Sequence, residues 1–184
     1  MKKQLASILI TNFNKDKYLS DTINSCLAQN YPKKEILIFD DKSTDNSLKI
    51  LKKYKKLKVL INKKKKFTSS PLNQINGIKE LFKKSKGEII FLLDSDDCFK
   101  KNKIKNIMKL FNQDKKLNFL QDIPYSSKDK RTVKLKYKYH FFSIWPSFYP
   151  TSTISVRKDF FLKFLNYLEP KKFPNLEIDA RLCI

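Results

Sequence analysis

The feature that most constrains the fold of this 184-residue chain is a regular alternation of short apolar runs with helix-like segments over its first 112 residues. The runs are rich in isoleucine and leucine, as expected for strands that are buried on both faces of a sheet. This alternation predicts an α/β fold with a mostly parallel, Rossmann-like central sheet and helices on both faces. The predicted strands are residues 5–10, 36–39, 57–61 and 88–93, and the predicted helices are residues 19–27, 48–51, 71–84 and 104–111.

The pattern becomes less regular after residue 112. We interpret the chain as one domain, with residues 1–112 as one half and residues 113–184 as the other. Ligands of such sheets bind beyond the carboxyl ends of the strands, so the loops after Ile10, Phe39 and Leu93 should share one crevice. The segments expected in the second half are extended pieces at 117–121, 131–138 and 151–157, a helix over 158–168, and a last stretch, 175–184, that ends without a recognisable cap, as in a truncated chain.

The net charge of +22 raises the question of nucleic-acid binding. Of the 40 basic residues, however, only Arg131, Arg157 and Arg181 are arginines, and the lysines are scattered through every segment. Recognition of bases and phosphates favours the planar arginine fork. The charge is better explained by a lysine-rich bias of the source proteome, or by loose attraction to an anionic membrane surface, than by nucleic-acid binding. The dense run 63–66 is interpreted as a solvated loop.

Cysteine and histidine usage bears on the compartment and on metal chemistry. Cys26, Cys98 and Cys183 lie far apart and His140 is the one histidine, so neither a disulfide framework nor a zinc site is indicated. We expect a reducing, cytoplasmic location. The apolar runs are far too short to span a bilayer, so any membrane contact should be peripheral.

An acidic motif, Asp-Ser-Asp-Asp at residues 94–97, directly follows the apolar run that ends at Leu93. Carboxylate oxygens suit Mn²⁺ or Mg²⁺, and a magnesium-like ion usually keeps positions open for substrate phosphate. The motif therefore predicts a metal site for a phosphorylated substrate, with Asp94, Asp96 and Asp97 as ligands. Alternatively, Asp94 and Asp96 only cap the turn and the following helix.

A second acidic pair, Asp40-Asp41, ends the run 36–39. Its carboxylates could accept hydrogen bonds from a nucleoside held in the same crevice. The alternative, a capping aspartate in the turn, applies to Asp45 without conflicting with this role for Asp41.

Four features in the same order carry a resemblance to a known family. They are a first-strand loop with an aromatic residue and an asparagine, the segment AQNYP, the turn DDKSTD, and LLDSDD before a helix. With them, residues 5–112, and more loosely 140–184, resemble family-two glycosyltransferases of the A-type (GT-A) fold. The resemblance implies a nucleoside diphosphate sugar donor, expected to be a UDP-sugar, and Mn²⁺ or Mg²⁺ as cofactor.

The resemblance also implies roles for individual residues. Thr11 and Asp41 should contact the nucleobase, Asp94 the ribose or the metal, and Asp96 the metal and the diphosphate. The other residues expected in the donor site are Asn12, Asn14, Gln74 and Ser95.

The chain departs from the family pattern in two places. It has Thr11-Asn12 where the first strand often ends in a proline-threonine pair. It also lacks the arginine that approaches the donor phosphates just before Asn76. Gln74 or a lysine of the run 63–66 could replace that arginine, or the donor could be held differently.

An inverting transfer also requires a base for the acceptor hydroxyl. Aspartates that bind a metal are poor bases because the cation lowers their proton affinity. The segment Glu177-Ile178-Asp179 looks like the acidic motif that opens a late helix in the family. Asp179 is the expected base and Glu177 the alternative; without the resemblance, an ordinary helix N-terminus is the simpler interpretation.

Together these features predict an inverting, metal-dependent glycosyltransferase that acts on a glycan or lipid-linked acceptor in surface polysaccharide synthesis. A sugar nucleotidyltransferase is disfavoured because the chain has only Gly77 and Gly87 and thus no glycine-rich phosphate loop. A non-catalytic binding module is the other alternative, and it would show no donor turnover.

Overall fold

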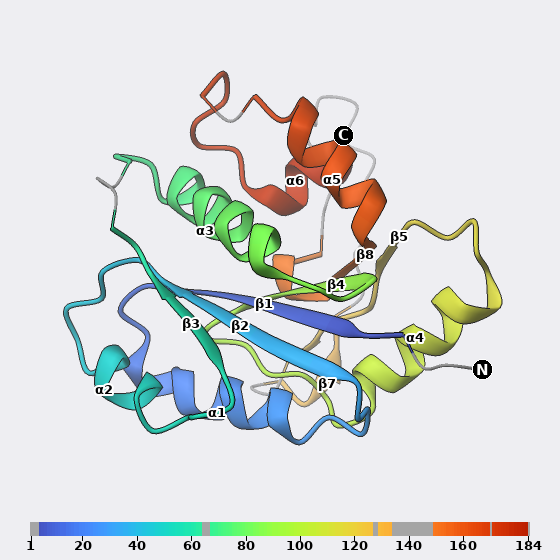
Figure 1. Cartoon of the computed structure of the whole chain (residues 1–184), viewed down its shortest axis with the longest axis horizontal. Helices are drawn as coiled ribbons and strands as arrows, with labels where there is room; N and C mark the ends of the chain where they lie inside the picture. The colour runs from blue at the N-terminus through green and yellow to red at the C-terminus, as the bar shows by residue number, and fades with distance from the viewer. Residues whose placement is uncertain (1–3, 64–66, 127–128, 134–148, 170, 184) are drawn as a thin grey trace.

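The computed structural model describes residues 4–63, 67–126, 129–133, 149–169 and 171–183. Figure 1 shows one twisted sheet with helices packed on either side of it. The elements in chain order are β1 (Ala6–Asn12), α1 (Asp16–Leu27), β2 (Lys34–Asp40), α2 (Ser47–Leu51), β3 (Lys58–Ile61), α3 (Ser70–Lys84), β4 (Ile89–Asp94), α4 (Lys103–Gln113), β5 (Phe119–Gln121), β6 (Tyr125–Ser126), β7 (Arg131–Thr132), the 3-10 helix η1 (Thr151–Thr153), β8 (Ile154–Arg157), α5 (Lys158–Tyr167) and α6 (Ile178–Cys183).

The main sheet has six strands in the order β3-β2-β1-β4-β8-β5. The four strands from the first half of the chain are parallel, and β8 is antiparallel to both of its neighbours. β1 lies between β2 and β4, and its Thr11 is paired with Phe39 on one side and with Asp94 on the other. The carboxyl ends of these three strands therefore lie side by side.

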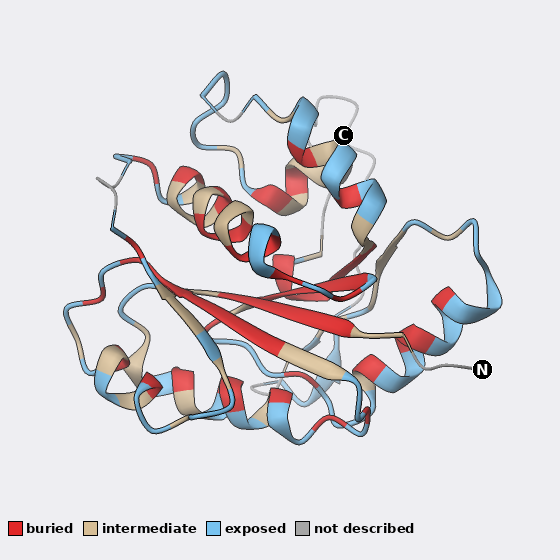
Figure 2. Ribbon diagram, in the orientation of Figure 1, coloured by how far each residue is buried: buried red, intermediate tan, exposed pale blue. Residues whose placement is uncertain are grey.

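The core has two layers because each central strand is buried on both faces. In β1, Ile8 and Ile10 face the layer covered by α1, α2 and α4, whereas Leu9 faces the layer covered by α3, α5 and α6. Figure 2 shows the buried residues running along the strands and along one side of each helix. The expected α/β fold, with a mostly parallel sheet and helices on both faces, is confirmed.

The predicted elements of the first half are all present, with small shifts of their ends. The second half differs more from prediction. Residues 151–153 were expected to be extended but form a 3-10 turn, because the Thr153 amide and hydroxyl both donate to Pro150 O, at 2.8 and 2.7 Å. Of the extended piece 131–138, only Arg131–Thr132 forms a strand, and residues 134–138 lie outside the described part of the chain, as do Lys64 to Lys66 and His140.

The second half completes the sheet beside β4. β8 pairs with β4 through Ile90 and Val156 and continues the core of the α3 face. Lys103, at the start of α4, bridges to Asp122 and donates to Ser152 O at 2.9 Å, which ties α4 to η1. Among the described residues, no helix is long and apolar enough to cross a membrane.

Helix α3 approaches the sheet closely at Gly77. A Cβ atom at this position would lie 2.7 Å from Phe39 Cδ1 and 3.1 Å from Thr11 Cγ2. These contacts are tighter than van der Waals packing allows, and the ring of Phe39 is buried. The missing side chain thus sets the distance between α3 and the carboxyl ends of β1 and β2.

We predict that Gly77→Ala lowers the free energy of unfolding by about 1–3 kcal/mol, the usual cost of overpacking a core. Urea denaturation would measure the change, with Lys84→Ala at the exposed end of α3 as a control expected within about 0.5 kcal/mol of the parent. If the better helix propensity of alanine made Gly77→Ala more stable than the parent, the close approach would not be a constraint.

Candidate active site

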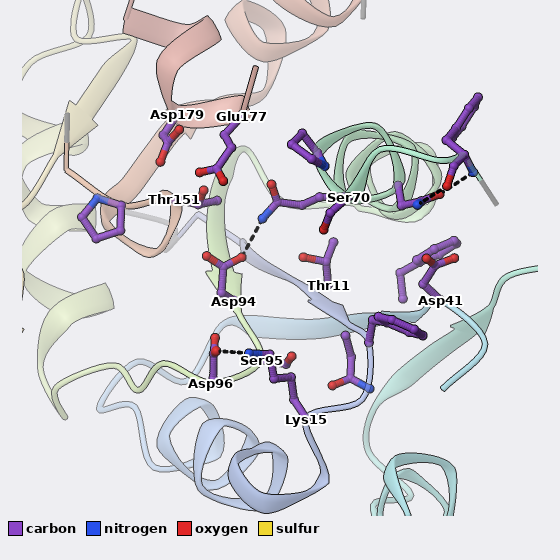
Figure 3. Close-up of a pocket in the computed structure, with 18 of the residues that line it drawn as sticks. Thr11, Lys15, Asp41, Ser70, Asp94, Ser95, Asp96, Thr151, Glu177 and Asp179 are labelled. Atoms are coloured by element: carbon purple, nitrogen blue, oxygen red, sulfur yellow. Dashed lines mark hydrogen bonds and ion pairs between the residues drawn. The ribbon is translucent and has the colours of Figure 1, made fainter. Parts of the chain in front are cut away.

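A cavity of about 570 Å³ opens at the carboxyl ends of β1, β2 and β4. The first turn of α3, the 3-10 turn η1 and the start of α6 complete its walls (Figure 3). The crevice expected after Ile10, Phe39 and Leu93 is therefore present. It collects nine of the residues predicted for the site: Thr11, Asn12, Asp41, Gln74, Asp94, Ser95, Asp96, Glu177 and Asp179.

Asp94, the last residue of β4, lies at the centre of this cavity. Its backbone amide donates to Ser152 Oγ at 3.0 Å, and its Oδ1 accepts a hydrogen bond from Gln74 Nε2 at 2.8 Å. Burial, reinforced by the nearby charges of Asp97 and Asp96, raises the pKa of Asp94 to about 7. The ionised form of Asp94 is thus disfavoured at this position.

Asp96 faces the cavity from the loop after β4 and forms an ion pair with Lys15, at 2.6 Å between Nζ and Oδ2. Ser95 between the two aspartates is buried, and its carbonyl oxygen accepts a hydrogen bond from Thr22 Oγ1 at 2.9 Å. The Asp97 amide closes a turn onto Asp94 O at 3.1 Å, and Asp97 does not line the cavity. The turn therefore directs Asp96, and not Asp97, into the site.

A divalent cation suits this corner of the cavity. The Lys15 ammonium forms an ion pair with Asp96, and the charges of Asp97 and Asp96 add to the effect of burial in raising the pKa of Asp94. Among the described residues, however, no three His, Cys, Asp or Glu side chains are grouped so as to hold a metal by themselves. A magnesium-like ion is typically held by one or two carboxylates together with substrate phosphates. The metal role of Asp94, Asp96 and Asp97 stays a prediction, and such an ion would need ligands from a substrate.

The loop after β1 is fixed against the turn after β2. Asn12 Nδ2 donates to Asp40 Oδ2 at 2.8 Å and to Ser43 Oγ at 3.2 Å. Asn14 has a left-handed backbone, φ 52°, and its Oδ1 accepts a hydrogen bond from the Thr44 amide at 2.8 Å. Asn14 does not line the cavity. Both asparagines thus make loop-to-loop contacts that hold the rim of the site, and their expected contact with a donor stays a prediction.

Asp41 and three aromatic side chains form the end of the cavity beside β2. The Asp41 amide donates to Asn12 O at 2.9 Å, and Asp41 Oδ1 accepts a hydrogen bond from Asn62 Nδ2 at 2.6 Å. Phe13, Phe39 and Phe67 line the same cavity, with Phe13 47% and Phe67 41% exposed. A carboxylate beside flat apolar surfaces matches the needs of a nucleobase, which offers both N–H donors and a ring face.

Glu177 and Asp179 reach the cavity from the opposite wall, at the start of α6 (Figure 3). Asp179 Oδ1 accepts a hydrogen bond from the Ala180 amide at 2.6 Å, and Thr151 lines the same cavity. Burial raises the pKa of Asp179 despite the hydrogen bond, and its charge contributes to raising the pKa of Asp94. A raised pKa makes an ionised carboxylate a stronger proton acceptor.

Several residues of this cavity were not among the predicted site residues, Lys15, Phe67 and Thr151 among them. Lys15 directly follows Asn14 in the first loop, but its pairing with Asp96 joins residues far apart in the chain. Phe67 lies in no predicted element, and Thr151 begins a segment that was expected to be extended, so both enter the cavity only through folding.

The chain is similar to known proteins in family profile, sequence and structure. A family profile described as glycosyl transferase family 2 matches residues 7–167. An uncharacterized glycosyltransferase of Nostoc is 35% identical over 105 residues, which are 57% of this chain and 32% of that protein. The poly(ribitol-phosphate) beta-N-acetylglucosaminyltransferase TarS of Staphylococcus aureus is 31% identical over 103 residues, 54% of this chain and 18% of TarS.

Solved structures share the fold. The crystal structure of TarS residues 1–349 in complex with UDP superposes with a TM-score of 0.65 and 21% identity, covering 86% of this chain and 48% of that one. The mannosyltransferase PcManGT of Pyrobaculum calidifontis, in complex with GDP-Man and Mn²⁺, gives a TM-score of 0.66 at 12% identity, covering 89% and 47%. These structures show that the chain has the GT-A type fold, and the chain spans about half or less of the proteins it matches.

We predict that Asp94→Asn changes how the stability of the metal-free protein depends on pH. Because the folded pKa of Asp94 is raised to about 7, the folded state keeps a proton that the unfolded chain loses near its ordinary value of 3.8. This contribution to stability is complete at low pH and is lost as pH rises toward and through 7. The asparagine variant lacks this loss, so it should gain stability relative to the parent between pH 5 and pH 8. Urea denaturation of both proteins in the presence of a chelator, at several pH values in this range, measures the difference in the free energy of unfolding. A difference that does not change with pH would contradict the prediction.

Proposed function

Because this chain belongs to glycosyl transferase family 2, we propose that it transfers a sugar from a nucleoside diphosphate donor to a hydroxyl of a glycan acceptor. The observation that carries the proposal is the single cavity in which the acidic loop after β4 meets the ends of β1 and β2 and the acidic start of α6. Such a cavity offers a nucleoside end, a cation-attracting centre and a second acidic wall in one continuous space.

The proposed donor is a UDP-sugar. Solved relatives contain UDP, UDP-GlcNAc or GDP-Man. Thr11 and Asp41 would contact the base, with Phe13 and Phe67 beside its ring. The diphosphate would then extend toward Asp94 and Asp96, with Gln74 alongside. This places the sugar between β4 and the start of α6.

The proposed mechanism is inverting. The acceptor oxygen attacks the anomeric carbon, the bond from that carbon to the diphosphate breaks, and the hydroxyl proton passes to a carboxylate. Asp179 is the proposed base, and Glu177 is the alternative. Mn²⁺ or Mg²⁺, held by Asp96 and Asp94 with Asp97 nearby, would neutralise charge on the leaving diphosphate.

The proposed acceptor is a growing surface polysaccharide or a lipid-linked glycan. TarS, by its name, acts on poly(ribitol-phosphate), an anionic polymer. The net charge of +22 would favour an anionic acceptor, or an acceptor held at an anionic membrane surface. We propose a cytoplasmic protein that contacts the membrane only peripherally.

We predict that Asp96→Asn weakens Mn²⁺-dependent UDP binding tenfold or more, about 1.4 kcal/mol, because it removes a charged ligand oxygen. The fold should be unaffected because Asp96 is exposed. Calorimetric titration of UDP with and without Mn²⁺ measures the effect, and Asp159→Asn, in the first turn of α5, is the control. Parental Mn²⁺-dependent affinity in Asp96→Asn would remove Asp96 from the metal site.

We predict that Asp179→Asn lowers the transfer rate by about 10²-fold or more, the usual scale for losing a general base. UDP affinity should stay within about 0.5 kcal/mol of the parent, since the base does not hold the nucleotide. UDP release from UDP-GlcNAc in the presence of candidate acceptors measures the rate, with Glu177→Gln in parallel. A larger loss in Glu177→Gln would exchange the two roles, and no turnover by the parent with any donor would favour a binding module.

A further inference from the structure

The charges of this protein are strongly segregated. The chain carries a net charge of +22, yet among the described residues that line the cavity Lys15 is the one basic side chain. It stands against five acidic lining residues: Asp41, Asp94, Asp96, Glu177 and Asp179. Any ion that binds in the cavity will therefore change the electrostatic interactions of Lys15.

The backbone of Lys15 is held at the start of α1, and its ammonium is paired with Asp96. Its carbonyl oxygen accepts hydrogen bonds from the Tyr18 and Leu19 amides, at 3.0 and 2.9 Å, and so begins α1. The next residue, Asp16, is tied to the turn after β2 by its amide, which donates to Asp45 Oδ2 at 2.9 Å. The ammonium is thus joined by a flexible four-carbon side chain to a backbone position that hydrogen bonds hold in place.

The position of this lysine is electrostatically unfavourable for the helix itself. The N-terminus of a helix carries partial positive charge and favours anions, so a lysine there is opposed by the helix dipole. Its stabilising partner is Asp96, with 2.6 Å between Lys15 Nζ and Asp96 Oδ2. The side chains of Lys15 and Asp96 are 42% and 37% exposed, and a pair this open to solvent is weak enough to exchange.

An ammonium 2.6 Å from Asp96 Oδ2 and a divalent cation bound to the same carboxylate repel each other, so each weakens the binding of the other. We propose that Lys15 is a tethered counter-cation that occupies Asp96 in the empty site and is displaced from it when the divalent ion binds. Lys15 thereby opposes binding of the metal alone.

Displacement leaves the Lys15 ammonium in a cavity that then holds a divalent ion. A donor diphosphate supplies anionic oxygens to which the released ammonium can turn within the reach of its tether. The metal and the diphosphate therefore bind cooperatively, and by linkage each strengthens the other by the same factor. The coupling ensures that the site is loaded with metal and donor together.

This inference rests on the proposed function in one respect, that Asp96 is a metal ligand. Its test compares Lys15→Met with Lys17→Met, which removes the same charge from an exposed position on α1. Calorimetric titration with Mn²⁺ alone should show about fivefold tighter binding to Lys15→Met than to the parent or to Lys17→Met, the scale of a solvent-exposed ion pair. Heat denaturation at fixed Mn²⁺ should show a correspondingly larger stabilisation of Lys15→Met.

The second half of the test repeats the Mn²⁺ titration at a fixed excess of UDP. UDP binds Mn²⁺ in solution equally for every variant, so only differences between variants are interpreted. The gain in Mn²⁺ affinity caused by UDP should be about fivefold smaller in Lys15→Met than in the parent and in Lys17→Met.

The outcomes separate the inference from the proposed function. Equal Mn²⁺ affinity of the three proteins would overturn the inference and leave the metal-dependent function standing. Weaker UDP binding in Lys15→Met with unchanged Mn²⁺ affinity would also overturn it, because Lys15 would then contact only the donor. Absence of Mn²⁺ binding in all three, with and without UDP, would overturn both the inference and the proposed metal site.

Discussion

The parallel pairing of β1 with β2 and β4 is the constraint on which the rest of this structure depends. Thr11 is in register with Phe39 and with Asp94, so three loops that are separated by dozens of residues begin at one edge of the sheet. The strands keep this register because their apolar residues alternate between two buried layers, and a shift by one residue would exchange the layers. Packing of the apolar strand residues thereby fixes the positions of the polar site residues at the strand ends.

The pairing also concentrates negative charge that the chain must then accommodate. Asp94 ends a buried strand, and burial, with the charges of Asp97 and Asp96 added to it, raises its pKa, which reflects a cost of ionising a carboxyl there. Gln74 and Lys15 relieve part of this cost, the first as a hydrogen-bond donor to Asp94 and the second as a counter-charge on Asp96. A cavity with this many acidic side chains attracts cations, and this property links the fold to the proposed transfer chemistry.

The first half of the chain was predictable because local pattern and tertiary structure agree there. The run Ile89 to Leu93 is apolar throughout and is followed at once by charge, and only a buried strand ending at an open edge satisfies both. In the second half the pattern was weaker. Residues 151–153 have the β-branched composition of a strand, yet Pro150 O captures the Thr153 amide and turns the chain before β8 begins.

The sequence by itself determined the order of strands and helices in the first half of the chain, the crevice at the carboxyl ends of the strands, and the acidic residues that line it. Hydrophobic periodicity and contiguous motifs predicted the first half, whereas Glu177 and Asp179 were expected only through the resemblance to the family. Only the tertiary structure decided that Asp96 and not Asp97 faces the cavity, that Asn14 holds a neighbouring loop, and that Lys15 reaches across to Asp96. The physical reason is that side-chain direction and ion pairing depend on turn geometry and on distances between segments, which no local pattern encodes.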